Sequence, residues 1–163
     1  TASESPCPER PCCHNRAVPN PGTSTRSTWS IMHSILVVDD DRLIREILVD
    51  ALTRTGYRVL QCDDGKDVMG ILRNHPTDLL ITDLFMENTD GLATISTVRK
   101  AFPNLKVVAI SAGSSRIDQD YLPIAQKLGA HAAFHKPVNL DDLLVTVAQL
   151  LATTSRNPPD QQE

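Results

Sequence analysis

Short apolar runs alternate with longer amphipathic segments through most of this chain. Apolar runs bounded by turn residues predict buried strands, and apolar residues that recur every three or four positions predict helices. The runs are SILVVD at 34–39, YRVLQC at 57–62, DLLITD at 78–83, LKVVAIS at 105–111 and the weaker HAAFHK at 131–136. Because parallel strands need crossover connections, this alternation predicts an α/β fold with a parallel sheet covered by helices on both faces.

Each amphipathic segment places its apolar residues on one face, and turn-forming residues mark its ends. The expected buried stripes are Leu43, Ile44, Ile47, Leu48, Ala51 and Leu52; Val68, Ile71 and Leu72; Leu92, Ile95, Val98 and Phe102; and Leu140, Leu143, Leu144, Val147 and Leu151. Gly56 and Gly129 are expected to end two helices, Asp63-Asp64-Gly65 to form a turn, and Asn139 to cap the last helix.

The two ends of the chain lack this periodicity. Residues 1–33 carry five of the eleven prolines and many Ser and Thr. Such a segment buries too little apolar surface to offset its ordering entropy, so we expect disorder at 1–33 and at 153–163, with one domain over 34–152. Met32 directly precedes the first predicted strand, which leaves open that translation starts there and that the tail is an upstream extension.

The amino-terminal cysteines add a possible metal site. Cys7, Cys12, Cys13 and His14 are potential ligands, but the C-x-x-C pairs typical of zinc sites are missing. The alternative is a loose tail whose thiols stay reduced.

Composition narrows the class of protein. The net charge is −4 and no zinc-finger spacing or lysine-rich stripe occurs, so we expect no direct contact with nucleic acid. No apolar run is long enough to span a membrane and no signal-peptide core is present, so we expect a cytoplasmic protein that does not insert into membranes.

Charged and polar side chains stand where the predicted strands end. They are Asp39, Asp40, Asp83, Ser111 and Lys136. Ligands of open parallel α/β sheets bind outside these carboxyl ends. Crowded carboxylates repel one another unless a cation lies among them, and oxygen ligands without His or Cys suit Mg²⁺. A carboxylate beside Mg²⁺ can attack phosphorus and become an aspartyl phosphate, with the Lys136 ammonium and the Ser111 hydroxyl contacting the phosphoryl group.

Taken singly, each of these residues has an ordinary structural explanation. The run Asp39 to Asp41 could cap a helix, Asp83 could cap the loop that follows it, Ser111 could be a turn residue, and Lys136 could be a solvated lysine. Their common position at strand ends favours the functional interpretation.

The motifs together resemble the receiver domain of bacterial two-component response regulators. They are VVDD at 37–40, ITD at 81–83, DG at 90–91, IS at 110–111 and KP at 136–137, and the resemblance covers 34–152. It implies a flavodoxin-like, doubly wound, five-stranded parallel sheet of strand order 2-1-3-4-5 with five helices.

The resemblance also implies roles for single residues. Asp83 would be the phosphoacceptor, Mg²⁺ would be held by Asp40, Asp83 and the backbone carbonyl of Phe85, and Asp39 would belong to the same acidic cluster. Ser111 and Lys136 would contact the phosphoryl group, and the Lys136-Pro137 peptide would be cis. The donor would be a phosphohistidine of a histidine kinase or a histidine phosphotransfer protein.

Several positions depart from the family pattern. Glu87 stands where proline is usual, and Ala133 replaces the aromatic switch residue of many receivers, while Phe134 should face the other side of the sheet. Phe85 and Gly113 would flank the attacking water, and neither side chain can hydrogen-bond it, so slow hydrolysis is expected. Without the switch residue, we expect the response to appear mainly in the loop 112–120.

No output domain follows the last predicted helix, so the sequence indicates a stand-alone receiver that relays phosphate or binds a downstream protein, which the sequence does not name. It would not be an enzyme beyond transfer to its own aspartate and slow autodephosphorylation. One alternative is a haloacid-dehalogenase-type phosphatase with Asp39 and Asp41 as its D-x-D pair, although Leu43 replaces the expected threonine. Another is a receiver-like binding module that takes no phosphate.

Overall fold

The computed structural model describes residues 32–87, 89–112 and 121–153. In chain order its elements are β1 Ser34–Val38, α1 Arg42–Arg54, β2 Arg58–Cys62, α2 Gly65–Asn74, β3 Leu79–Asp83, α3 Gly91–Ala101, β4 Lys106–Ala112, α4 Leu122–Lys127, β5 Ala132–Lys136 and α5 Leu140–Ala152. The predictions for Cys7, Cys12, Cys13, His14, Gly113 and the loop 113–120 lie outside the described residues, as do nearly all of both expected tails.

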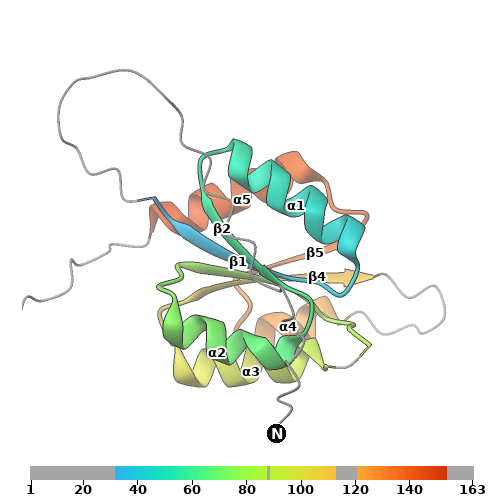
Figure 1. Ribbon diagram of the computed structural model, residues 1–163. Helices are drawn as coiled ribbons and strands as arrows, with labels where there is room; N and C mark the ends of the chain where they lie inside the picture. Colours follow the sequence, from blue (N-terminus) through green and yellow to red (C-terminus); the bar gives the residue numbers. More distant parts are fainter. Residues whose placement is uncertain (1–31, 88, 113–120, 154–163) are drawn as a thin grey trace, which may run out of the picture.

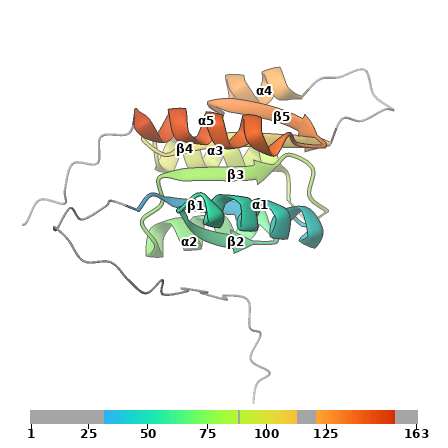
Figure 2. The same cartoon turned by 90° about the horizontal axis from the view of Figure 1, so that it is seen from above.

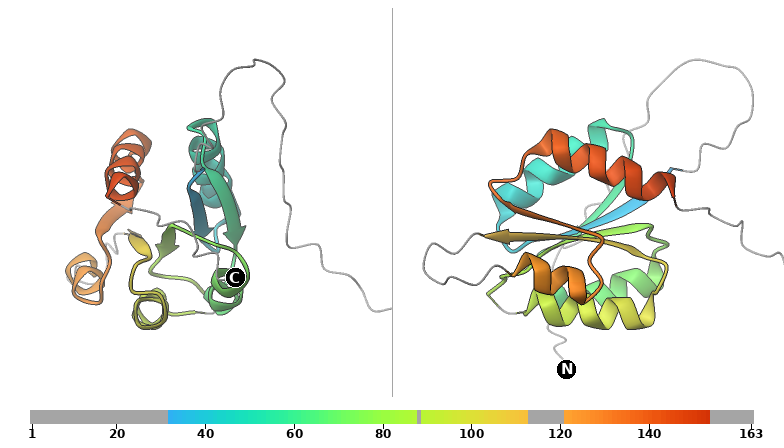
Figure 3. Two further views of the ribbon diagram at one scale, coloured as in Figure 1. Left: turned by 90° about the vertical axis from the view of Figure 1, so that its left-hand side faces the viewer. Right: turned by 180° about the vertical axis from the view of Figure 1, so that it is seen from behind.

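The strands form one parallel sheet in the order β2-β1-β3-β4-β5, as the resemblance implied. Helices α1 and α5 lie on one face, and α2, α3 and α4 lie on the other (Figures 1 and 3). Figure 2 shows the strands running side by side with their carboxyl ends toward one edge. Asp83 at the end of β3 pairs in register with Ile110 of β4, so the segments that follow these strands start as neighbours.

Alternation along the strands divides the apolar core into two layers. One layer, beneath α1 and α5, contains Ile35, Val37, Leu48, Leu52, Leu79, Ile81, Val108, Ile110, Leu143, Val147 and Leu151. The other, beneath α2, α3 and α4, contains Leu36, Val38, Val68, Leu72, Leu80, Leu84, Ile95, Val98, Leu105, Val107, Ala109, Ala125 and Ala130. A central strand such as β3 is therefore buried on both faces, which explains its continuous apolar sequence.

Side-chain oxygens begin four of the helices. Asp41, Asp64, Asp90 and Asn139 accept hydrogen bonds from backbone N–H groups in the first turns of α1, α2, α3 and α5. Asn139 was predicted in this role. The turn expected at Asp63-Asp64-Gly65 is corrected, because Asp64 is the cap and Gly65 is already helical. Gly56 and Gly129 follow helix ends with φ of 96° and 111°, which glycine adopts without strain.

The buried stripe predicted for α1 is too wide. Leu48 and Leu52 are buried, whereas Leu43 and Ile47 are 66% and 45% exposed. At about 100° per residue, the six apolar residues cover roughly half of the helix circumference, and only the edge that carries Leu48 and Leu52 faces the sheet. The sequence pattern alone does not say which edge of a wide stripe is buried.

Among the described residues, no helix has the length and apolar character needed to cross a membrane.

Candidate functional site

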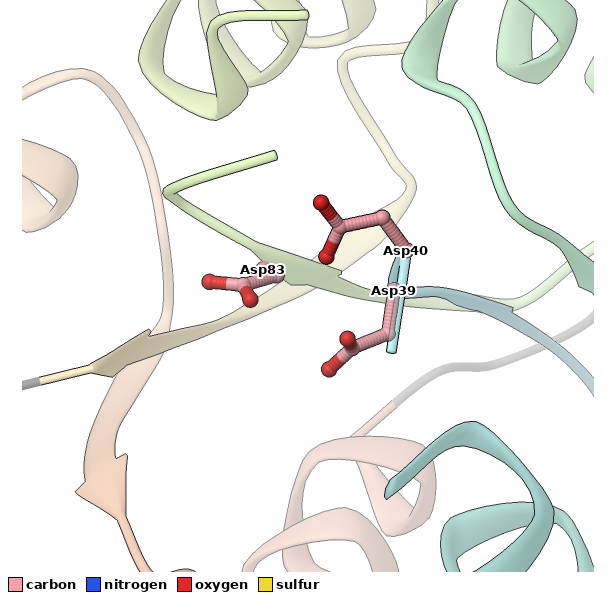
Figure 4. Close-up of side chains that lie close together, drawn as sticks. All are labelled: Asp39, Asp40 and Asp83. Atoms are coloured by element: carbon pink, nitrogen blue, oxygen red, sulfur yellow. The ribbon is translucent and has the colours of Figure 1, made fainter. Parts of the chain in front are cut away.

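Three carboxylates meet at the carboxyl edge of the sheet. Asp39 and Asp40 directly follow β1, and Asp83 ends the neighbouring strand β3. One oxygen of each lies within 4.8 Å of the others, and Figure 4 shows the three side chains around a common space. Asp39 and Asp83 are 1% and 2% exposed, whereas Asp40 faces solvent. The structure thus gathers the three acidic residues that the sequence analysis singled out.

A backbone N–H orients each of these carboxylates. Asp39 Oδ1 accepts from Asp41 N at 2.9 Å, and Asp83 Oδ1 accepts from Phe85 N at 3.0 Å. Asp40 Oδ2 accepts from Glu87 N at 2.9 Å, which links the end of β1 to the loop after β3. The positions of the carboxylates are therefore set by the backbone of two loops.

Lys136 balances the two buried charges. Its Nζ lies 2.5 Å from Asp83 Oδ2 and 2.9 Å from Asp39 Oδ2. Burial lowers the pKa of Lys136, but its ion pairs with Asp83 and Asp39 outweigh burial, so the pKa lies above its ordinary value. Burial raises the pKa of the Asp39 carboxyl, although Lys136 and the Asp41 N–H act in the opposite direction. A protonated lysine is thus the cation that this structure holds beside the carboxylates.

The site fits a divalent cation as well. Asp39 Oδ2 is buried and, despite the nearby ammonium, accepts no hydrogen bond of good geometry from any described residue. Carboxylate oxygens are the hard ligands that Mg²⁺ prefers, and the three acidic residues supply them from two adjacent strand ends. The donor set therefore matches the expected metal.

The loop between β3 and α3 is held against the end of β3. Phe85 forms an isolated antiparallel bridge with Asp90, and Gly91 N donates to Leu84 O at 3.2 Å. A Cβ on Gly91 would lie 2.2 Å from Asp83 O and 2.6 Å from Leu84 Cα. Only glycine permits this approach, so the DG motif at 90–91 combines a helix cap with a close backbone contact.

The other predicted site residues lie near this edge with less direct contacts. Ser111 is 3% exposed, and its hydroxyl donates to Ala112 O at 3.3 Å, so its contact with a phosphoryl group stays a prediction. The Lys136-Pro137 peptide is cis, as predicted. Ala133 packs against the core beneath α2, α3 and α4, and Phe134 packs against the opposite core, so no aromatic ring from position 133 or 134 faces the former layer.

Sequence reasoning missed three contacts around the site. Arg45 Nη1 donates to Asp39 O at 2.5 Å. The Thr89 hydroxyl donates to the carboxylate of Asp64, the cap of α2. The ring of Phe85 packs edge-to-face on that of Tyr121. Arg45 lies one helical turn after Asp41, the cap of α1, so its side chain can reach back to Asp39, and the sequence shows this spacing. The other two contacts join residues far apart in the chain and leave no local signal in the sequence.

Comparison with known proteins agrees with this geometry. The family model of the response regulator receiver domain matches residues 35–148. The chain belongs to this family. The receiver domain of NtrX from Brucella abortus superposes with a TM-score of 0.68 at 27% identity, covering 74% of this chain and 99% of that one.

Two curated relatives show how this chain compares with longer regulators. It is 34% identical over 129 residues to the DNA-binding transcriptional regulator NtrC of Azospirillum brasilense, covering 77% of this chain and 25% of the relative. It is 32% identical over 127 residues to the response regulator MprA of Mycobacterium sp. (strain KMS), covering 78% of this chain and 53% of the relative. This chain therefore spans about a quarter to a half of the length of these relatives.

Proposed function

We propose that this protein receives a phosphoryl group on Asp83 from a phosphohistidine of a histidine kinase or a histidine phosphotransfer protein. The observation that carries the proposal is the position of Asp83: its carboxylate is buried, lies beside Lys136 Nζ, and shares a space with two further carboxylates. Membership of the receiver family supports the same conclusion.

The contacts of Asp83 suggest which atom reacts. Phe85 N holds Asp83 Oδ1, whereas Oδ2 contacts the ammonium group of Lys136. We therefore expect Oδ2 to attack phosphorus. The new O–P bond forms as the P–N bond to the donor imidazole breaks, and the imidazole nitrogen keeps the electron pair. Lys136 stays protonated, because the raised pKa favours its charged form, and it moves its ion pair from the carboxylate to the phosphoryl oxygens.

Asp39, Asp40, Asp83 and the backbone carbonyl of Phe85 would hold Mg²⁺. When bound, Mg²⁺ neutralises part of the negative charge that the carboxylates and the phosphoryl group bring together. The backbone bonds to Asp39 and Asp40 keep both carboxylates in place before the donor arrives.

The phosphorylated protein would pass its phosphoryl group along a relay or bind a downstream protein. Apart from transfer to its own aspartate and slow hydrolysis, no catalytic activity is proposed. The relatives NtrC and MprA are named as regulators, which is consistent with such a role. We propose that this activity takes place in the cytoplasm.

Intact-mass spectrometry after incubation with acetyl phosphate and Mg²⁺ tests the proposal. We expect the mass of one phosphoryl group to appear, to depend on Mg²⁺, and to be absent from Asp83→Asn. The exposed Asp63→Asn is the matched control and should be phosphorylated like the unaltered protein. No mass increase in the unaltered protein would instead favour a binding module that takes no phosphate.

A further inference from the structure

Two aromatic side chains connect the loop between β3 and α3 to the start of α4. The ring centroids of Phe85 and Tyr121 are 4.9 Å apart and the ring planes meet at 86°. This edge-to-face arrangement is favoured by the charge distribution of the rings and adds to the stabilisation from burial alone. Tyr121 is half-buried and packs against the core beneath α2, α3 and α4, whereas Phe85 is 44% exposed. Tyr121 therefore provides an anchored surface against which the Phe85 ring rests.

The position of Phe85 depends on the acceptor carboxylate. Its N–H donates to Asp83 Oδ1, and its backbone pairs with Asp90. A phosphoryl group on Asp83 changes the charge distribution of the carboxyl group and therefore the strength and direction of the bond from Phe85 N. Movement of that backbone displaces the attached ring.

The other ring lies at the start of a helix. Tyr121 directly precedes α4, and its carbonyl accepts from Ala125 N at 2.9 Å in the first turn. The same short helix carries Ile124, and Leu128 caps its carboxyl end; these side chains are 40% and 37% exposed. A change at Tyr121 is therefore communicated to a helix with apolar side chains on the surface.

We propose that the Phe85–Tyr121 contact couples the state of Asp83 to the amino end of α4. The coupling rests on the proposed phosphorylation of Asp83. It needs no aromatic residue at position 133, where Ala133 offers only a methyl group. Tyr121 is thus a positioning residue for the loop that follows the acceptor strand β3.

Fluorine NMR can observe this contact directly, because the chain contains two tyrosines, Tyr57 and Tyr121. Tyr57 packs against the opposite core and serves as an internal reference. In protein labelled with 3-fluorotyrosine, we expect acetyl phosphate and Mg²⁺ to shift the Tyr121 resonance and to leave that of Tyr57 in place. The Tyr57→Phe variant assigns the two signals. In Phe85→Leu, which keeps the backbone N–H, the Tyr121 shift should be lost although intact mass shows phosphorylation.

The outcomes separate the coupling from the phosphorylation. An unchanged Tyr121 resonance in protein shown by mass to be phosphorylated contradicts the coupling alone, and so does an equal shift in Phe85→Leu. If no phosphoryl group is gained, the proposed function is wrong and the coupling with it.

The Phe85 N–H donates to Asp83 Oδ1, so loss of the Tyr121 ring on which Phe85 rests should also affect the acceptor carboxylate. Tyr121→Leu should change the lifetime of the aspartyl phosphate by about two- to tenfold, the range that an aromatic pair of this geometry commonly contributes. Tyr121→Phe keeps the ring and should stay within a factor of about two, as should Tyr57→Phe. A lifetime in Tyr121→Leu equal to that of the unaltered protein would overturn the proposal.

Discussion

Lys136 offsets the repulsion between two buried carboxylates, and this role gives a test at the scale of single residues. Lys136→Met keeps the length of the side chain and removes its charge, which leaves Asp39 and Asp83 without their common partner. Because breaking a buried ion pair costs about 3–5 kcal/mol, we expect a loss near the lower end of that range in urea unfolding at pH 7. Added Mg²⁺ should recover part of it, since a ligand of the native state stabilises that state.

Lys66→Met is the matched control for this substitution. Lys66 lies 3.8 Å from Asp64, and 69% of its side chain is exposed. An exposed pair of this kind contributes at most about 1 kcal/mol. Equal losses of stability in the two variants would contradict the role given to Lys136.

His131 provides a pH-dependent test away from the acidic site. Burial lowers the pKa of His131, and the nearby Lys106 and Arg99 act in the same direction. Its Nδ1 accepts from Val107 N at 3.1 Å, which suits the neutral ring. The unfolded chain therefore takes up this proton first as the pH falls. The stabilisation from neutral His131 is complete above pH 6.5 and is lost as the pH falls through the folded pKa.

Proton NMR of the histidine rings checks this expectation. His131 should titrate with a midpoint below 6.5 in the folded protein and nearer 6.5 in urea. In His131→Gln, the stability should fall less steeply between neutral and acidic pH. A midpoint at or above the value in urea would show that burial and the positive neighbours do not lower the pKa of this ring.

The sequence predicted most of the residues of the acidic site, although each of them alone had an ordinary structural explanation. Asp39, Asp40, Asp83 and Lys136 were found because each stands at or just after the carboxyl end of a strand, and parallel strands bring these ends together. The contact between Phe85 and Tyr121 was not predictable in this way. It depends on where α4 begins in space, and no local pattern in the sequence encodes that position.

Gly91 and Gly70 form a matched pair at the scale of helices and strands. A Cβ on Gly91 would collide with the backbone of β3, so Gly91→Ala must separate α3 from the strand that carries Asp83. We expect a loss of about 1–3 kcal/mol, the usual cost of overpacking. Gly70 lies within α2 with open space around its Cα, and Gly70→Ala should add about 0.5–1 kcal/mol because alanine favours the helix. Thermal unfolding of both variants measures the difference, and changes of the same sign would refute this packing account.

Neighbouring positions on α1 test the corrected stripe. Leu48 is buried against the sheet, so Leu48→Ala should cost about 2–5 kcal/mol. Ile47 is 45% exposed, and Ile47→Ala should change stability by less than about 1 kcal/mol. Similar losses in the two variants would mean that the whole apolar face of α1 is buried. The stripe was misjudged because apolar spacing marks a helix face without saying how much of it the sheet covers.

At the scale of the whole molecule, the alternation of strands and helices was sufficient to predict a parallel sheet with helices on both faces. It did not fix the strand order, since crossovers of the same length can place a strand on either side of its predecessor. The order 2-1-3-4-5 came from the family resemblance and was confirmed by the pairing of β1 with both β2 and β3. That pairing places Asp39 and Asp40 beside Asp83, so the topology creates the site.

Reductive trapping tests the central claim most directly. Borohydride reduces an aspartyl phosphate to homoserine, and peptide sequencing by mass spectrometry then locates the altered residue. After incubation with acetyl phosphate and Mg²⁺, we predict homoserine at position 83 and unchanged aspartate at positions 39 and 40. Homoserine at another aspartate, or a phosphorylated protein without homoserine at position 83, would contradict the assignment of Asp83 as the phosphoacceptor.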